Sequence, residues 1–131
     1  MAKTLDQHLR VAEITDFPGA LNGLQLENSG EVTRLGAAVD ACEAVLAQAI
    51  QKGIDLLIVH HGLYWQGNQR IVGPFYRKLK RAMDADLAVY SAHLPLDIHP
   101  QLGNAAILSQ AIAFRRATRN PSSLGKISIS A

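Results

Sequence analysis

Residues 40–61 read DACEAVLAQAIQKGIDLLIVHH, and this stretch contains the unit on which the fold depends. Its first part carries apolar residues at helical spacing: Val45, Leu46, Ala49 and Ile50. This spacing predicts a helix, which Asp40 and Glu43 begin as a capping pair and which Gly53 ends. The short apolar run DLLIV (55–59) that follows is typical of a strand buried on both faces of a sheet.

Elements of the same two kinds alternate along the rest of the chain. The patterns predict, in order, a short first helix with Leu5, Leu9 and Ala12 on one face, a loop over 16–32, a buried strand over 34–40, a helix over 74–85 opened by Pro74, a strand over 86–93 and a last helix over 103–114. Helices that alternate with buried strands indicate an α/β fold. We therefore expect one parallel-stranded sheet flanked by helices.

The composition is that of a globular protein. The chain has 131 residues, of which 48% are hydrophobic and 18% charged, and this suits one folded domain. Thirteen basic and eleven acidic residues leave a charge of +2, too small to indicate nucleic acid or an anionic membrane as a partner. The longest aliphatic run, 56–59, is too short to span a bilayer, and the N-terminus lacks the apolar core of a secretory signal. With a single cysteine, Cys42, the expectation is a cytoplasmic protein without an internal disulfide.

Imidazole and carboxylate groups follow the ends of the three predicted parallel strands. They are Asp40 at the end of the first strand, His60 and His61 after the second, and His93 and Asp97 after the third. Ligands of open parallel sheets bind outside the carboxyl ends of the strands. We therefore expect these groups to meet at one edge of the sheet.

Divalent-metal binding is the chemistry that uses this set of groups. Neutral imidazole and carboxylate are ligands for zinc, manganese and iron. Neighbouring residues on an ideal strand point to opposite faces, so the pair His60 and His61 is better suited to two ions side by side than to one, unless the chain turns there. Asp97 is a further ligand or a bridge in this interpretation. Two ions about 3.5–4 Å apart would activate water for hydrolysis.

Each of these residues also has a purely structural interpretation. His93 alone could cap a helix or pack in the core, and Asp97 alone could be a turn residue. Asp40 is better explained as the helix cap than as a ligand. His8 and His99 are expected at the surface. A plain α/β domain whose histidines merely solvate the strand ends is therefore an alternative to the metal site.

Three stretches resemble a known family: LNGLQLEN (21–28), VDACEAVLAQAIQKGIDLLIVHHGLYW (39–65) and YSAHLPLDIHPQLGNAAIL (90–108). Together they are similar to the Nif-three-like dinuclear-metal family, whose members are often named as homologues of a type 2 GTP cyclohydrolase I. The resemblance covers roughly residues 4–112, in the right order and spacing. It implies that this chain has the fold of the N-terminal portion of the family.

The resemblance also implies a site and an assembly. His60, His61 and Asp97 match the N-terminal metal ligands of the family, and His93 matches a histidine that lines the same site. The family holds two ions per subunit and forms ring-shaped hexamers whose metal pairs face an internal cavity. In a hydrolytic reaction, water would be the nucleophile and His93 a proton shuttle, hence a catalytic residue, or an outer ligand.

The chain departs from the family in its C-terminal part. Members are about twice as long, and their second half supplies a closely spaced His and Glu that this sequence lacks. We divide the chain into an incomplete metal-binding domain over 1–114 and an atypical basic, Ser-rich tail over 115–131, which contains no His, Asp, Glu or Cys. We expect a truncated gene product or a fragment, which holds at most one ion tightly and has little or no cyclohydrolase activity.

Two classes of function follow from these observations. The first is a metal-dependent hydrolase of a nucleotide-like substrate, similar to GTP cyclohydrolase. The second is a non-catalytic, ring-forming scaffold or interaction protein with a structural or storage metal site. A coordination position that faces solvent would favour the enzyme, because a structural site is closed.

Overall fold

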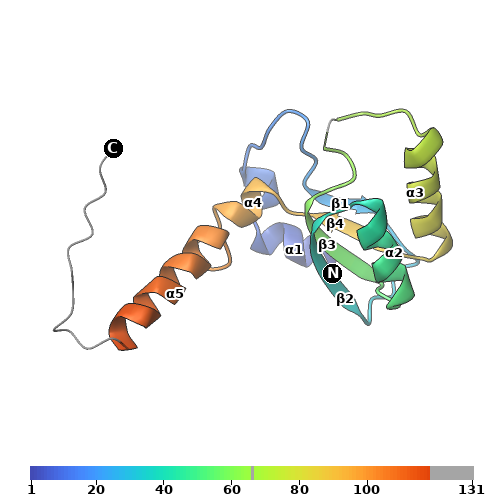
Figure 1. Cartoon of the computed structure of the whole chain (residues 1–131). Helices are drawn as coiled ribbons and strands as arrows, with labels where there is room; N and C mark the ends of the chain where they lie inside the picture. Colours follow the sequence, from blue (N-terminus) through green and yellow to red (C-terminus); the bar gives the residue numbers. More distant parts are fainter. Residues whose placement is uncertain (66, 119–131) are drawn as a thin grey trace.

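The computed structural model describes residues 1–65 and 67–118 and shows a four-stranded sheet with helices on both faces (Figure 1). The strands lie in the order β1-β4-β3-β2 and are β1 (Gly23–Leu26), β2 (Leu35–Asp40), β3 (Leu56–His61) and β4 (Ala88–Ser91). The helices are α1 (Ala2–His8), the 3-10 helix η1 (Val11–Glu13), α2 (Glu43–Gln51), α3 (Gly73–Asp84), α4 (Leu94–Asp97) and α5 (Asn104–Thr118). Helix α5 points away from the sheet in Figure 1.

The sheet is mixed, whereas the sequence predicted a purely parallel sheet. Strands β2, β3 and β4 are parallel, but β1 pairs with β4 in the antiparallel direction. Strand β1 lies inside residues 16–32, which we expected to be a loop. It is only four residues long, begins at Gly23 with a φ of +97° and has an irregular register between Leu24 and Leu26. A strand of this length is too short to show a clear alternation of apolar and polar residues in the sequence. It forms because it pairs with β4, which lies far along the chain.

Strand β2 is also less buried than predicted. It forms one edge of the sheet, and its side chains alternate between the two faces. Ala38 packs against the core beneath α2, whereas Leu35 is 53% exposed and Val39 is 63% exposed. The face of β2 that carries Leu35 and Val39 is therefore more exposed than the face that carries Ala38. The apolar pattern predicted the strand correctly but not its position at the edge.

Helix α2 confirms the predicted stripe and the predicted end. Leu46 and Ala49 are buried, and Gly53 has a φ of +63°, a conformation that glycine adopts without strain. The predicted capping pair is wrong. Cys42 occupies the N-cap position without a side-chain hydrogen bond and is exposed, and Glu43 instead pairs with Arg81 of α3 at 3.3 Å.

Helix α1 is shorter than the predicted first helix. It ends at His8, and Arg10 follows with a φ of +55°, which interrupts the helical path. Leu9 is buried as predicted, but Ala12 belongs to η1 and is exposed. The predicted apolar face therefore holds for Leu5 and Leu9 only.

The core has two parts, one on each face of the sheet. The larger part joins α2 and α3 to the sheet and includes Leu57, Val59 and Val89. The smaller part joins α1 to the opposite face and includes Leu56 and Tyr90. Both faces of the central strands β3 and β4 are therefore covered, and the residues at the ends of these strands have fixed positions.

Tyr90 links α1 to the sheet. Its ring is fully buried, and its hydroxyl donates a hydrogen bond of 2.8 Å to Asp6 Oδ1. Burial raises the pKa of Tyr90, so the phenol remains a donor. Tyr90→Phe is expected to lower the free energy of unfolding by about 1–2 kcal/mol, because it removes a hydrogen bond to a charged group. Urea unfolding measures the difference, and Tyr76→Phe, at a position 50% exposed on α3, should change stability little. Equal losses in the two variants would contradict this role of Tyr90.

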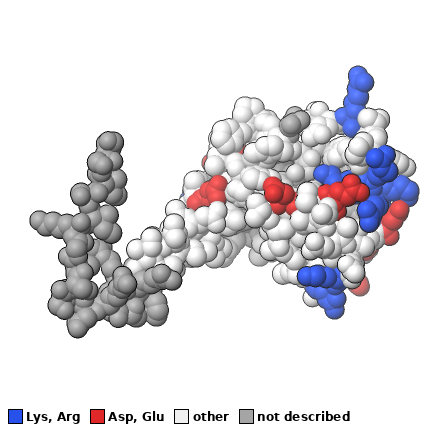
Figure 2. Space-filling model, in the orientation of Figure 1, with Lys and Arg blue, Asp and Glu red and all other residues white. Residues whose placement is uncertain are grey.

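The charged side chains on the visible surface form mixed groups. Figure 2 shows Lys and Arg mainly at the end of the molecule that carries α3, with acidic side chains beside them. Two of the pairs are Lys80 with Asp84 and Arg81 with Glu43. No helix within residues 1–65 and 67–118 combines the length and the apolar character that a bilayer span requires.

Candidate metal centre

Three histidines meet at the carboxyl ends of β3 and β4. His60 and His61 end β3, and His93 lies between β4 and α4. Each offers one ring nitrogen, and these three nitrogens all lie within 4.8 Å of one another. The rings of His60 and His61 are only 4.7 Å apart between centroids, although the two residues are adjacent on a strand. Both therefore belong to one group, and the three residues could hold a metal ion.

Every ring in this group has its Nδ1 atom occupied by an oxygen. The contacts are His60 Nδ1 to the carbonyl oxygen of Ala92 at 3.1 Å, His61 Nδ1 to Asp40 Oδ1 at 2.6 Å, and His93 Nδ1 to Asp16 Oδ1 at 2.9 Å. Carbonyl and carboxylate oxygens only accept, so each Nδ1 carries the hydrogen. In a neutral ring the lone pair is then on Nε2. The three acceptors thus leave three Nε2 atoms available as metal ligands, an arrangement common to metal-binding histidines.

Asp97 lies beside this group rather than within it. Its Oδ2 atom is 3.5 Å from His60 Nε2, and its Oδ1 atom accepts a hydrogen bond of 3.1 Å from the amide of Asn104. Two ligand atoms that share one ion at about 2.0–2.1 Å in tetrahedral geometry are about 3.4 Å apart. The separation of Asp97 from His60 therefore fits two ligands of one ion. The predicted metal roles of His60, His61, His93 and Asp97 stay predictions.

Asp40 has a different partner from the one predicted. Its carboxylate accepts from His61 and does not cap α2. The reason is the register of the parallel strands, which places Asp40 directly opposite His61. Asp40 therefore supports the site, although the sequence made a helix cap the better explanation.

Sequence reasoning missed Asp16 and Asn22, which lie before β1. The side chain of Asp16 is only 5% exposed and accepts from His93, from the side chain of Asn22 and from the backbone N–H of Phe17 and Leu94. Burial alone would raise the pKa of Asp16, but these hydrogen bonds outweigh it and lower the pKa to about 2. No pattern pointed to the two residues, because their partners lie more than seventy positions along the chain.

The stability of the protein in acid is expected to depend on Asp16. Its folded-state pKa of about 2 lies below the ordinary 3.8, so the folded state binds the proton less readily than the unfolded state. The contribution of Asp16 is complete well above pH 3.8 and is lost as the pH falls through 3.8 toward 2. It amounts to about 2 kcal/mol. Urea unfolding of the wild type and Asp16→Asn over this range should show a difference that shrinks in acid, and a constant difference would refute the assignment.

Two aromatic residues border the histidines. The ring of Trp65 lies 4.6 Å from that of His93 and 4.8 Å from that of His61, and Trp65 is 39% exposed. The exposed ring of Phe17 lies 5.8 Å from that of His93. Since Trp65 is the only tryptophan in the chain, its fluorescence reports on this site.

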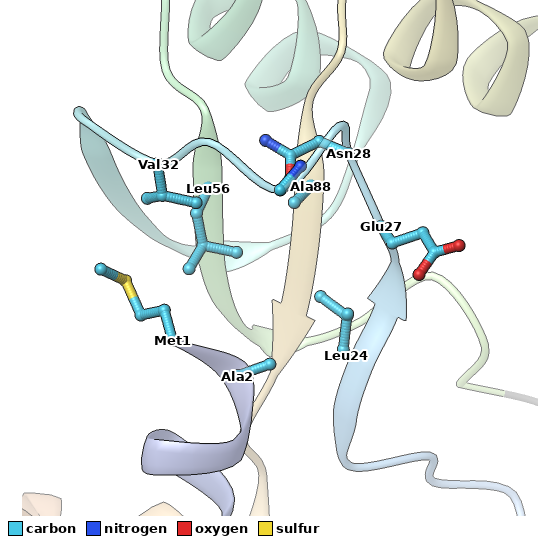
Figure 3. A pocket seen from close by; sticks show the side chains of 9 residues that line it. Met1, Ala2, Leu24, Glu27, Asn28, Val32, Leu56 and Ala88 are labelled. Carbon is cyan, nitrogen blue, oxygen red and sulfur yellow. The ribbon is translucent and has the colours of Figure 1, made fainter.

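A cavity lies away from the histidines. A cavity of about 370 Å³ lies at the other end of the parallel strands, where Leu56 and Ala88 begin β3 and β4 (Figure 3). Its lining is mostly apolar, with Glu27 and Asn28 at the end of β1. None of the three clustered histidines lines this cavity.

The other two histidines are not in the group. His8 is exposed as predicted, and its ring stacks on that of His99 at 6.0 Å between centroids. His99 is half-buried, and its Nδ1 atom accepts from the backbone N–H groups of Gln101 and Leu102. His99 therefore shapes the turn before α5.

Comparison with known proteins links the chain to one family. The family described as Duf34/NIF3 (NGG1p interacting factor 3) matches residues 1–127. A relative named "GTP cyclohydrolase 1 type 2 homolog" from Deinococcus radiodurans is 40% identical over 114 residues, and one of the same name from Escherichia coli (strain K12) is 38% identical over 115 residues. Each alignment covers 87% of this chain, but only 43% and 46% of the relatives.

The solved structures agree. TTHA1606 from Thermus thermophilus superposes with a TM-score of 0.76 at 43% identity, over 83% of this chain and 45% of that chain. The reduced form of HcgD from Methanocaldococcus jannaschii superposes with a TM-score of 0.69 at 31% identity, over 83% of this chain and 45% of that chain. This chain thus spans less than half the length of the relatives that it matches.

Proposed function

Because the chain belongs to the Duf34/NIF3 family, as the sequence predicted, we propose that it binds one divalent metal ion through His60, His61 and His93, with Asp97 as a fourth ligand. The observation that carries the proposal is the common state of the three rings. Each has Nδ1 engaged by an acceptor, which leaves Nε2 as the ligand atom of the neutral ring, and one nitrogen of each ring lies within 4.8 Å of the other two. A cluster of histidines that merely solvated the strand ends would not need this shared orientation.

One ion is a better fit than two. Three imidazoles and one carboxylate complete a four-coordinate shell for zinc, and the same groups suit manganese or iron with added water. A second ion would need further ligands and a bridging carboxylate to offset the repulsion between the cations. The Oδ2 atom of Asp97 lies near His60 and Oδ1 already accepts from Asn104, so a bridge through both oxygens would have to share Oδ1 with Asn104.

We propose hydrolysis of a nucleotide-like substrate as the chemistry of the complete family site. The names of the relatives suggest this class of reaction. A bound divalent ion would act as a Lewis acid. In this chain, His93 is paired with a buried carboxylate, since Asp16 accepts its Nδ1 hydrogen and orients the ring. His61 is 40% exposed, so solvent reaches this edge of the site. An ion held by the three histidines alone would keep a fourth position for water, as a catalytic site requires.

We also propose that the chain self-associates, as the hexameric assembly implied by the resemblance requires. Large apolar side chains are exposed on β2 and α5: Leu35, Val39, Ile107, Leu108 and Ile112. Such surfaces mark contacts between proteins. Light scattering should give a mass above that of the 14.2 kDa chain, and a monomer at tens of micromolar would argue against the assembly.

Metal titration tests the proposed function. The untagged protein is freed of metal with a chelator and titrated with Co²⁺, which quenches a nearby indole, so the fluorescence of Trp65 should fall to saturation at one equivalent. Elemental analysis after dialysis against Zn²⁺ should return one ion per chain. Retention of two ions would contradict the one-ion site, and retention of none would leave the plain α/β domain whose histidines solvate the strand ends.

A further inference from the structure

A buried clamp lies behind the candidate metal ligand His93. Its members are Asp16 and Asn22, from the segment between η1 and β1. We propose that Asp16 and Asn22 are positioning residues, which hold the ring and backbone of His93 so that its Nε2 atom faces the other two histidines. The effect on metal affinity rests on the proposed function, whereas the effect on the ring of His93 does not.

Asp16 controls the ring. Its two oxygens lie 2.9 Å and 3.1 Å from His93 Nδ1, so the contact is nearly bidentate. Oδ1 also accepts from the backbone N–H of Phe17, and Oδ2 from that of Leu94. These contacts prevent the carboxylate from turning, and because it can only accept, the hydrogen of the neutral imidazole must be on Nδ1. The opposite tautomer would direct an N–H group at the cluster and could not bind a metal.

Asn22 controls the backbone at the same residue. Its Nδ2 donates to Asp16 Oδ2 at 2.7 Å, and its Oδ1 accepts from the backbone N–H of His93 at 2.7 Å. The side-chain amide of Asn22 therefore links the carboxylate of Asp16 to the backbone of His93. Ring and backbone are held together, which limits both the rotation and the translation of Nε2.

The exposed fractions support a role directed at His93. The side chain of Asp16 is 5% exposed and that of His93 10% exposed, so water competes little for their hydrogen bond. The other carboxylate–imidazole pair at the site is far more open, with His61 at 40% and Asp40 at 59% exposure. The clamp is therefore the more rigid of the two supports.

Nitrogen NMR of the metal-free protein tests the proposal directly. With the ring neutral, long-range proton–nitrogen spectra should show His93 with a protonated Nδ1 and an unprotonated Nε2. In Asp16→Asn one carboxylate oxygen becomes an NH₂ group, which cannot accept hydrogen bonds from the donors that contact Asp16 in the wild type. We expect the His93 signals to shift to a mixture of tautomers. A wild-type ring protonated on Nε2 would overturn the proposal, even if the variant did not fold.

Co²⁺ affinity, followed by the fluorescence of Trp65, gives the second test. Asp16→Asn should weaken binding about 10–100-fold, the usual cost of losing a group that orients a metal ligand. In a His93→Ala background the same substitution should have no further effect, because Asp16 acts through His93. Additive losses would show that Asp16 acts by another route.

A matched control separates positioning from general loosening. Asp55 resembles Asp16 in accepting from several groups at once, namely the backbone and side chain of Thr33 and the backbone of Arg34, but it lies at the start of the strands. Asp55→Asn should lower stability and leave both the affinity and the His93 signals unchanged. An equal loss of affinity in this control would overturn the proposal. If the wild type binds no Co²⁺, the proposed function fails, and the NMR result alone decides the role of Asp16.

Discussion

Replacing His61 with Ala is expected to abolish tight metal binding. The substitution removes one of the three clustered imidazoles, so water would have to take its place beside the remaining two imidazoles and Asp97, and the ion is held by fewer protein ligands. Loss of a group that only orients a ligand weakens metal binding by up to about 100-fold. Loss of the ligand itself should cost at least as much, so the dissociation constant for Zn²⁺ should rise by at least about 100-fold. Isothermal titration calorimetry of the metal-free protein measures the change.

Two controls make this result specific. His8→Ala removes an exposed imidazole outside the group and should leave the affinity unchanged. Asp40→Asn keeps the ring of His61 but replaces the acceptor of its Nδ1 hydrogen, so it should have an intermediate effect. Equal affinity of the wild type and His61→Ala would exclude His61 as a ligand.

The sequence predicted the parts of the fold that depend on local pattern. Three parallel strands and the helices between them follow from apolar runs and helical spacing, and the glycine at position 53 ends α2 as expected. Sheet position does not follow from such patterns. The apolar run RLGAAVD is compatible with a central strand and with an edge strand. The strand order places it at the edge, where Leu35 and Val39 are exposed.

The site shows the same division. The rule that ligands bind at the carboxyl ends of parallel strands predicted the meeting of His60, His61 and His93, and the structure brings these three together. It could not predict the groups that orient them. Asp16 reaches His93 across 77 positions of the chain, and Asp40 reaches His61 through strand register. These partners depend on tertiary packing, which leaves no fixed spacing in the sequence.

The second large effect is expected from Gly103→Ala. Gly103 lies buried between α4 and α5, and a Cβ atom there would come within 2.5 Å of the carbonyl oxygen of Asp97 and 2.6 Å of that of His99. Both obstacles are backbone atoms, which cannot rotate away as a side chain could. The end of α4 or the start of α5 must therefore move, at a cost of about 1–3 kcal/mol in the free energy of unfolding. Urea unfolding measures this loss.

Movement of α4 should also weaken the metal site, because Asp97 is its last residue and is held by Asn104 at the start of α5. We expect Gly103→Ala to lower Zn²⁺ affinity as well as stability. Gly36→Ala is the matched control, since its Cβ would meet only side chains, with Ile54 nearest at 3.1 Å, in a strand that does not contact Asp97 through any hydrogen bond described. Its stability loss should be smaller and its affinity that of the wild type. Unchanged Zn²⁺ affinity in Gly103→Ala, despite the loss of stability, would contradict the expected coupling between this turn and the metal site.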